Sequence, residues 1–309
     1  MAQGKGFGKT ILFGEHFVVY GMPAVASAIG DYTLAEVEPS KKTEIIDNRP
    51  ATEGYKETKR EEMQREFGAL FRFFGVKPEK NPLKITLSGN LFCTSGVGAS
   101  AALAVSISRA LNDMLGLGMD DEKINNAAYA AEEAGSGKPS GIDNTCSTYG
   151  GLLWFAKGLG GRPNTMKRLS IRKPVEIVLG NTGITQETKV VVDDVAAWGK
   201  ESPDEFRQIL DDYAETASKG KQAMQSFDMR KVGLLMDRNQ ELLRRVGVSC
   251  NEIENIIGIA KDNGAAGAKL TGTGRGGYVI CLTPGEGLQG KVAKAIEAAG
   301  FGTLKTTIG

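Results

Sequence analysis

The segment TSGVGASAAL, residues 94–103, places two glycines of a G-x-G pattern directly before an alanine-rich run. Glycine lets the backbone turn sharply and approach a ligand closely, because it has no Cβ atom. A helix that begins directly after such a loop presents N–H groups without intrahelical partners and the positive end of its dipole. The segment therefore predicts a loop and helix start that hold an anion.

The overall charge and composition exclude several classes of protein. The 309-residue chain has 38 Lys and Arg residues against 37 Asp and Glu residues, a net charge of +1. This balance gives no electrostatic basis for binding nucleic acid or an anionic membrane. No apolar run approaches the ~20 residues of a membrane helix, and the start, MAQGKGFGKT, lacks the apolar segment of a signal peptide. Four cysteines without a C-x-x-C pair argue against zinc or disulfides. We therefore expect a cytoplasmic protein.

Patterns typical of strands and helices follow one another in mixed order. The stretch TILFGEHFVVYGMPAVASAI is a series of short apolar runs broken by glycine, which predicts strands and tight turns. Dense mixed charge at residues 54–73 is typical of a solvated helix. Further helical patterns occupy residues 99–115, 121–134 and, three times, 203–262. The mixed order predicts an α+β fold. The length predicts two domains, which we place at residues 1–170 and 171–309.

The glycine-rich loop contains no lysine, so a nucleotide kinase built on it needs its lysine, metal ligands and base elsewhere in the chain. Lys9 precedes the apolar run TILFGEH, and Ser100 lies in the first turn of the helix after the loop. Glu132 and Glu133 lie at the end of the next helix, and Asp143 lies in the turn-rich segment GKPSGIDNT. A dinucleotide-dependent dehydrogenase is disfavoured, because the ~30 residues after the loop hold two helices and no returning strand.

Four segments resemble the motifs of the GHMP kinases. GKTILFGEHFVVYGMPAVASAI is similar to the first motif of that family, and GVGASAAL to its glycine-rich phosphate loop. KPSGIDNTCSTYGGLLWF resembles the segment with the catalytic Asp, and GAKLTGTGRGGYVICL resembles the third, glycine-rich motif. The four occur in the order of the family and span residues 8–282. Within the family, GEHFVVYG is most similar to the members that phosphorylate mevalonate.

The resemblance implies a GHMP kinase fold, with a ribosomal-S5-like N-terminal domain, a ferredoxin-like C-terminal domain, and ATP and substrate between them. It implies that Asp143 is the catalytic carboxylate, that Lys9 is its partner, and that Ser100 and Glu132 hold Mg²⁺. Glu132 is preferred to Glu133 because its spacing to Asp143 matches the family. The implied ATP-binding residues are Thr94, Ser95, Gly96, Val97, Gly98, Ala99, Ser100 and Ala101. The implied substrate-site residues are Glu15 and His16, which face the substrate acid, Thr188, and Gly272 and Gly274 near the phosphates.

The chain departs from the family pattern at a few positions. Phe92 and Cys93 stand where the family has prolines before its loop. Ala99 replaces the first serine of the family sequence G-L-G-S-S, which removes one hydroxyl near the phosphates. Arg275 interrupts a motif that the family builds from glycine and alanine. It is either an extra phosphate contact or a surface side chain, and the sequence leaves both open.

The resemblance implies ATP-dependent phosphorylation of the primary hydroxyl of mevalonate to 5-phosphomevalonate, a step of isoprenoid biosynthesis, by a homodimer. Two alternatives stay open. One is another small-molecule GHMP kinase, acting on phosphomevalonate or homoserine, and the other is a catalytically inactive sensor on the same scaffold. GEHFVVYG and Thr188 favour mevalonate. The presence of Lys9, Ser100, Glu132 and Asp143 argues against a sensor.

Overall fold

The computed structural model describes residues 1–94, 96–137 and 139–309, and the chain divides into two compact units. Unit 1 contains Met1–Lys9 and Ala28–Gly150, and unit 2 contains Thr10–Ser27 and Gly151–Gly309. Two strands therefore contribute residues to both units. They are β1 (Ala2–Phe13) and β2 (Ala24–Pro39). The expected domains 1–170 and 171–309 stay a prediction.

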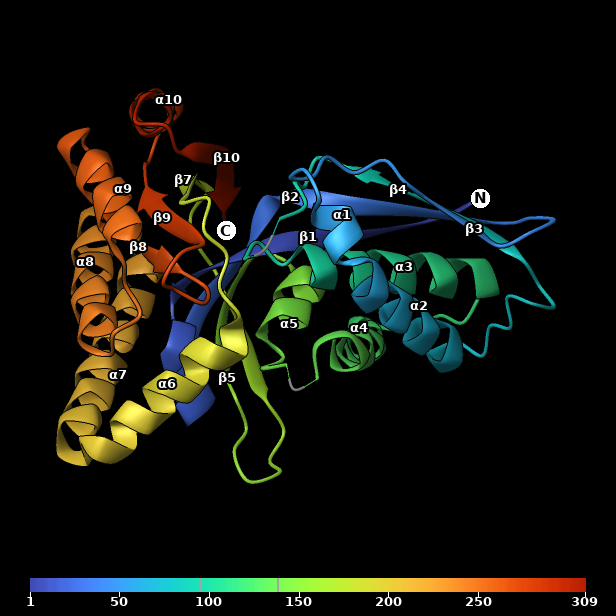
Figure 1. Ribbon diagram of the computed structural model, residues 1–309, viewed down its shortest axis with the longest axis horizontal. Coiled ribbons are helices and arrows are strands. Elements are labelled where there is room, and N and C mark those ends of the chain that lie inside the picture. The colour runs from blue at the N-terminus through green and yellow to red at the C-terminus, as the bar shows by residue number, and fades with distance from the viewer. Residues whose placement is uncertain (95, 138) are drawn as a thin grey trace. The chain divides into compact units, whose positions relative to one another are not determined.

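Unit 1 packs a group of helices against strands (Figure 1). Strand β4 (Leu83–Gly89) pairs antiparallel with β2 and parallel with β3 (Glu44–Asp47), while β1 pairs with β2. Helices α2, α3 and α4 contact one another, and α5 contacts α3 and α4. The helices are α1 (Tyr55–Thr58), α2 (Arg60–Phe73), α3 (Ala99–Leu115), α4 (Asp121–Ser136) and α5 (Ile142–Tyr149).

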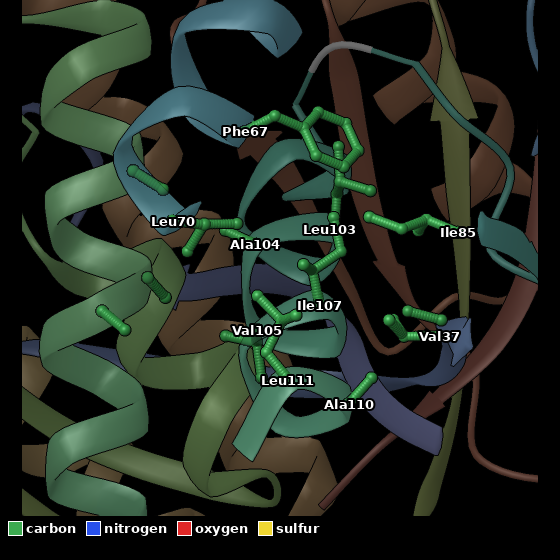
Figure 2. Packing of buried hydrophobic residues seen from close by; sticks show 14 of the residues in the cluster. Val37, Phe67, Leu70, Ile85, Leu103, Ala104, Val105, Ile107, Ala110 and Leu111 are labelled. Carbon is green, nitrogen blue, oxygen red and sulfur yellow. The ribbon is translucent and has the colours of Figure 1, made fainter. Parts of the chain in front are cut away.

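The core of unit 1 lies where these helices meet the strands (Figure 2). Val37 and Ile85 come from β2 and β4, Leu103 and Ile107 from α3, and Phe67 from α2, and all five are buried. Helix α3 is rich in alanine, the best helix former, and glycines in the left-handed conformation flank both of its ends. This helix therefore begins at a fixed position directly after the glycine-rich loop.

Unit 2 contains four antiparallel strands in the order β10-β7-β9-β8. Helices separate β7 from β8 and β9 from β10 along the chain, which gives the ferredoxin-like βαββαβ arrangement. Helices α8 and α9 pack on β8, and α10 packs on β7 and β10 (Figure 1). The four strands are β7 (Val175–Asn181), β8 (Gly267–Thr271), β9 (Tyr278–Leu282) and β10 (Gly302–Ile308).

The remaining elements of unit 2 are two further strands and the helices. Strand β5 (Leu152–Ala156) pairs with β6 (Thr165–Leu169) and with the Ala24–Ser27 part of β2. The helices are α6 (Thr188–Glu201), α7 (Pro203–Gln225), α8 (Met229–Arg245), α9 (Asn251–Asp262) and α10 (Glu286–Ala298). Among the described residues, no helix combines the length and apolar character needed to cross a membrane.

The expected α+β fold is confirmed, and the helices predicted for residues 99–115, 121–134 and 203–262 are present. The local prediction of strands and turns is wrong at one place, because EHFVVY forms a 3₁₀ helix, η1 (Glu15–Tyr20). Gly14 (φ 147°) and Gly21 (φ 78°) flank this helix. These φ values favour glycine, so the two residues let the chain turn at each end of η1.

Replacing Ile107 with alanine will lower the free energy of unfolding by about 2–5 kcal/mol, because a buried side chain is lost and a cavity remains. Ile107 is 0% exposed, whereas Leu115 in the same helix is 40% exposed. Leu115→Ala is therefore the matched control, with an expected change of about 0.5 kcal/mol or less. Urea denaturation measures both variants. Equal losses would contradict the packing in Figure 2.

Candidate active site

The glycine-rich loop of unit 1 is tied to β1 at Lys9. The backbone N–H of Lys9 donates to the Val97 carbonyl at 2.8 Å. Gly98 has a φ of 73°, and a Cβ atom there would lie 2.8 Å from Lys9 Cγ, so this position requires glycine on two counts. The N–H of Ala102 donates to the Gly98 carbonyl at 2.9 Å. The N–H groups that precede Ala102 in α3 therefore lie outside the intrahelical ladder and can bind an anion.

Buried side chains anchor the loop, and its backbone is exposed at Gly96, where φ is 101°. Ser100, in the first turn of α3, is half-buried. Ser95 lies outside the described residues. The buried loop residues are Thr94, Val97, Gly98, Ala99 and Ala101.

Lys9 and Asp143 form an ion pair, in which Lys9 Nζ lies 3.3 Å from Asp143 Oδ1. Gly141 adopts the left-handed conformation and precedes α5, so Asp143 lies in the first turn of this helix. The Lys9 side chain is 5% exposed and that of Asp143 is 36% exposed. A fixed, buried ammonium group therefore holds a carboxylate that remains accessible to a reactant.

Two further carboxyl groups of unit 1 are buried, and one of them, Glu132, interacts with the charges of Lys9 and Asp143. Burial raises the pKa of Glu132, on α4, well above its usual value, the charges of Asp143 and Glu66 raise it further, and Lys9 opposes the shift. Glu66, on α2, accepts a hydrogen bond from the Ser100 hydroxyl at Oε1. Burial raises the pKa of Glu66 to about 7, with the hydrogen bond from Ser100 opposing. Burial thus favours the neutral form of both carboxyl groups, and a cation beside them would favour the charged form.

These oxygen atoms suit Mg²⁺, which prefers oxygen ligands and is usually bound by one or two carboxylates together with substrate phosphates. The Ser100 hydroxyl and the Glu132 carboxylate are the protein donors that the sequence predicts. The buried Oε2 atom of Glu66 has no hydrogen-bond partner among the described residues. Within residues 1–94, 96–137 and 139–309, no three acidic, histidine or cysteine side chains are arranged as a metal site. Ser100 and Glu132 are therefore the residues of this group that could hold Mg²⁺.

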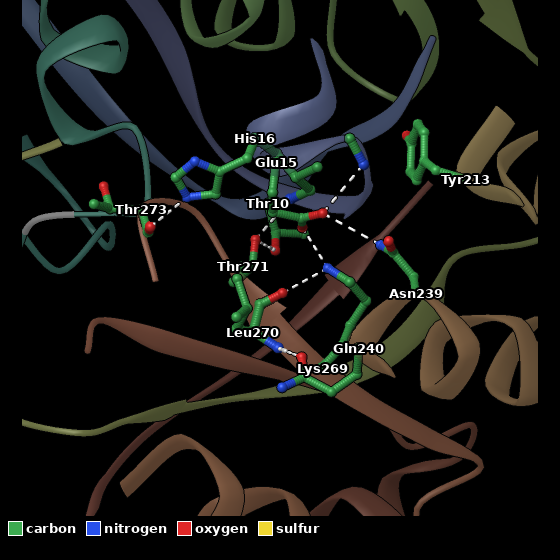
Figure 3. Close-up of polar contacts among 12 residues, drawn as sticks. Thr10, Glu15, His16, Tyr213, Asn239, Gln240, Lys269, Leu270, Thr271 and Thr273 are labelled. Atoms are coloured by element: carbon green, nitrogen blue, oxygen red, sulfur yellow. Dashed lines mark hydrogen bonds and ion pairs between the residues drawn. The ribbon is translucent and has the colours of Figure 1, made fainter. Parts of the chain in front are cut away.

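In unit 2, Thr273 contacts both His16 and Thr188. His16 Nε2 lies 2.6 Å from the Thr273 carbonyl oxygen (Figure 3), and because a carbonyl only accepts, we assign the proton of the neutral imidazole to Nε2. The hydroxyls of Thr273 and Thr188 lie 2.7 Å apart. His16 Nδ1 is buried and has no hydrogen-bond partner among the described residues. It is therefore a buried acceptor that no donor of the described residues satisfies.

The loop after β8 carries the other predicted residues of unit 2. Gly272 and Gly274 have φ values of 93° and 79°, which favour glycine. Arg275 also has a positive φ, 53°. Its guanidinium pairs with Asp194 at 2.5 Å and donates to the Gly247 carbonyl at 3.0 Å. Of the two roles left open by the sequence, these contacts favour a surface side chain held by protein groups.

Glu15 is fully buried in unit 2 (Figure 3). Its Oε1 atom accepts from Lys269 Nζ, and its Oε2 atom accepts from the Gly14 N–H at 3.1 Å and from Asn239 Nδ2 at 3.3 Å. Burial raises the pKa of Glu15 and lowers that of Lys269, and the attraction between their charges opposes both shifts. Protein donors thus occupy both carboxylate oxygens.

Sequence reasoning missed Glu66, Lys269 and Thr273. Glu66 lies in the segment that predicted a solvated helix, and the available signal was its spacing of four from the apolar Leu70, which places both on one face of α2. Lys269 and Thr273 lie within GAKLTGTGRGG, where only the glycines were singled out. Their polar side chains inside a glycine-rich, strand-forming segment were the signal.

Comparison with known proteins gives matches over most of the chain. Residues 60–151 match the GHMP kinases N terminal domain, and residues 221–301 match the GHMP kinases C terminal domain. The mevalonate kinases of Pyrococcus abyssi and Pyrococcus furiosus are each 32% identical over 97% of this chain, covering 93% and 94% of their own lengths. The crystal structure of L. major mevalonate kinase in complex with R-mevalonate matches with a TM-score of 0.94 and 35% identity, over 100% of this chain and 96% of that one.

The His16 imidazole will titrate below its ordinary pKa of 6.5, because burial disfavours its charged form. The unfolded chain then binds a proton that the folded chain does not. Folding stability is therefore lost as the pH falls from about 6.5 through the folded-state pKa. NMR of this single histidine gives the midpoint. The unfolding free energy of His16→Gln should lack this component of the pH dependence. A midpoint above 6.5 would contradict a buried neutral imidazole.

Proposed function

This chain belongs to the GHMP kinase family, and on that premise we propose that it transfers the γ-phosphoryl group of ATP to the primary hydroxyl of mevalonate. The product is 5-phosphomevalonate. The observation that carries the proposal is the ion pair of Lys9 and Asp143, whose Nζ and Oδ1 atoms lie 3.3 Å apart. The backbone of the same lysine binds the glycine-rich loop at Val97. The similarity to mevalonate kinases along nearly the whole chain supports mevalonate as the substrate.

Asp143 acts on the substrate hydroxyl. Its partly exposed carboxylate accepts a hydrogen bond from the primary hydroxyl of mevalonate and takes the proton as the oxygen receives the phosphoryl group. Lys9 Nζ keeps the carboxylate in one orientation and balances its charge. Positioning contributes more than early proton removal, because phosphoryl transfer passes through a loose transition state.

Ser100 and Glu132 are the residues that would hold Mg²⁺, which neutralises phosphate charge during the transfer. The N–H groups at the start of α3 bind the phosphates. Glu66 has a supporting role, because the Ser100 hydroxyl donates its proton to Glu66. That hydrogen bond leaves the lone pairs of the Ser100 oxygen free to face a cation.

His16 and Thr188 are the further residues that contact mevalonate in this proposal. Because His16 Nε2 donates to Thr273, Nδ1 accepts, and the neutral imidazole suits a hydroxyl of mevalonate better than its carboxylate. The Thr188 hydroxyl is held by Thr273 at 2.7 Å and can donate or accept. Gly272 and Gly274 keep the loop that carries Thr273 in its turn.

A substrate panel tests the proposal as a whole. ADP release is followed with mevalonate, phosphomevalonate and homoserine at saturating ATP and Mg²⁺. We expect turnover with mevalonate alone. Preference for either other alcohol would replace the substrate assignment, and no turnover with any of them would favour the inactive sensor. The homodimer and the cytoplasmic location implied by the resemblance stay predictions, and sedimentation of the purified protein measures the first.

Asp143→Asn should lower kcat by about 10²–10⁴, the range for a positioned acid–base group, while ATP still binds. Asparagine keeps the size of the side chain but cannot accept the proton. Asp113→Asn, at an exposed position of α3, is the matched control and should leave turnover unchanged. Measuring kcat and nucleotide affinity separates chemistry from binding. Near-normal turnover of Asp143→Asn would sink the assignment.

Ser100→Ala should raise the Mg²⁺ concentration needed for half-maximal turnover by at least about 10-fold, because a cation ligand is lost. Ser106→Ala is the matched control, since Ser106 is a buried serine of the same helix that donates to the Leu103 carbonyl. Magnesium titrations and melting curves compare the two variants. If Ser100→Ala lowers the melting temperature without changing the Mg²⁺ dependence, its hydroxyl has only a structural role.

A further inference from the structure

Three alternating residues of one segment bind the stretch from Thr10 to His16. Thr271 Oγ1 accepts from the Ile11 N–H at 3.0 Å, Lys269 Nζ binds the Glu15 carboxylate, and the Thr273 carbonyl accepts from His16. Residues two apart on a strand face the same side, so Lys269 and Thr271 project together from β8. Figure 3 shows these contacts as one group within unit 2.

The Glu15–Lys269 pair lies within this group, and Glu15 directly precedes His16 in the chain. Both side chains are 0% exposed. The carboxylate also accepts from the Gly14 N–H, so it fixes the backbone at the N-cap of η1, two residues before His16. The direction of the imidazole therefore depends on how this carboxylate is held.

We propose that Glu15 and Lys269 are positioning residues that hold the turn at Gly14 so that His16 Nδ1 is presented to mevalonate. Glu15 itself does not touch the substrate. The inference rests on the proposed function and deepens it, because it moves substrate recognition from Glu15 to the imidazole that Glu15 supports. The family resemblance assigned no role to Lys269. In this proposal, Lys269 holds the Glu15 carboxylate in place.

Desolvation explains why such a pair needs a role beyond stability. Removing two charges from water offsets most of their attraction, so apolar residues of similar volume often stabilise a core equally well. An apolar pair would fill the space but could not accept from the Gly14 N–H and Asn239 Nδ2 in fixed directions. The charged pair therefore supplies orientation.

Single neutral substitutions each leave one buried charge without its partner. Glu15→Gln leaves the Lys269 ammonium without a counter-charge, and Lys269→Gln leaves the Glu15 carboxylate without one. We expect each to lower the melting temperature on the order of 5–10 °C. We also expect kcat/KM for mevalonate to fall about 10–100-fold, with KM for ATP changed no more than about twofold, because only the mevalonate contact is displaced.

The double variant Glu15→Gln/Lys269→Gln separates positioning from direct contact. The amide carbonyl introduced at position 15 can accept from Gly14 and Asn239, while the NH₂ group beside it donates to the amide carbonyl introduced at position 269. The NH₂ group at position 269 can in turn replace the ammonium as donor to the Leu270 carbonyl. No buried charge remains. A positioning role predicts that kcat/KM for mevalonate returns to within about fivefold of wild type. If Glu15 touches the substrate, the double variant stays as impaired as Glu15→Gln, and the proposal is overturned.

Two further measurements keep the result unambiguous. The resonances of the single histidine should move in both single variants and return in the double variant, and unchanged resonances in Glu15→Gln would also overturn the proposal. Ile256→Ala, at a fully buried position of α9, is the control for lost stability and should leave KM for mevalonate unchanged. If the wild-type protein does not phosphorylate mevalonate, the proposed function fails, whereas the melting and NMR results still test the pair.

Discussion

The ion pair of the buried Lys9 with Asp143 is the interaction on which the rest of unit 1 depends. The backbone N–H of Lys9 also binds the glycine-rich loop at Val97, and the Lys9 side chain leaves room only for glycine at position 98. Burying an ammonium is unfavourable unless a counter-charge lies close by, so the lysine and the carboxylate maintain each other. Lys9 therefore fixes both the glycine-rich loop and the Asp143 carboxylate.

Each unit contains a buried lysine paired with a carboxylate, but the two carboxylates differ in exposure. The Asp143 side chain is 36% exposed, whereas that of Glu15 is 0% exposed. An accessible carboxylate can exchange protons with a reactant, and one enclosed by protein donors can only hold its neighbours in place. Exposure thus separates a reacting group from a supporting group when charge and pairing are the same.

The sequence predicted the elements that local pattern decides. Helices such as Pro203–Gln225 and Met229–Arg245 have long periodic patterns with few breakers. The 3₁₀ helix at Glu15–Tyr20 escaped prediction, because FVV favours a strand locally and the contact that holds Glu15 comes from Lys269, 254 residues later. Glu66 was missed for a similar reason, since only tertiary packing buries one acid among the many charges of its helix. The loop, Lys9 and Asp143 could be identified from the sequence, because each lies in a motif that a short segment of the chain defines.

Each unit is built from two segments that are separated in the sequence, and this affects how the chain can fold during synthesis. Residues Thr10–Ser27 belong to unit 2, but the rest of that unit begins only at Gly151. At a synthesis rate of about 5–20 residues per second, Glu15 waits roughly 13–50 s for Lys269 to leave the ribosome. Until then Glu15 lacks its counter-charge. Phe17 of η1 stacks on Tyr213, so nascent chains that stop before residue 213 lack the ring that covers this apolar side chain, and such uncovered apolar surface is the kind that chaperones bind.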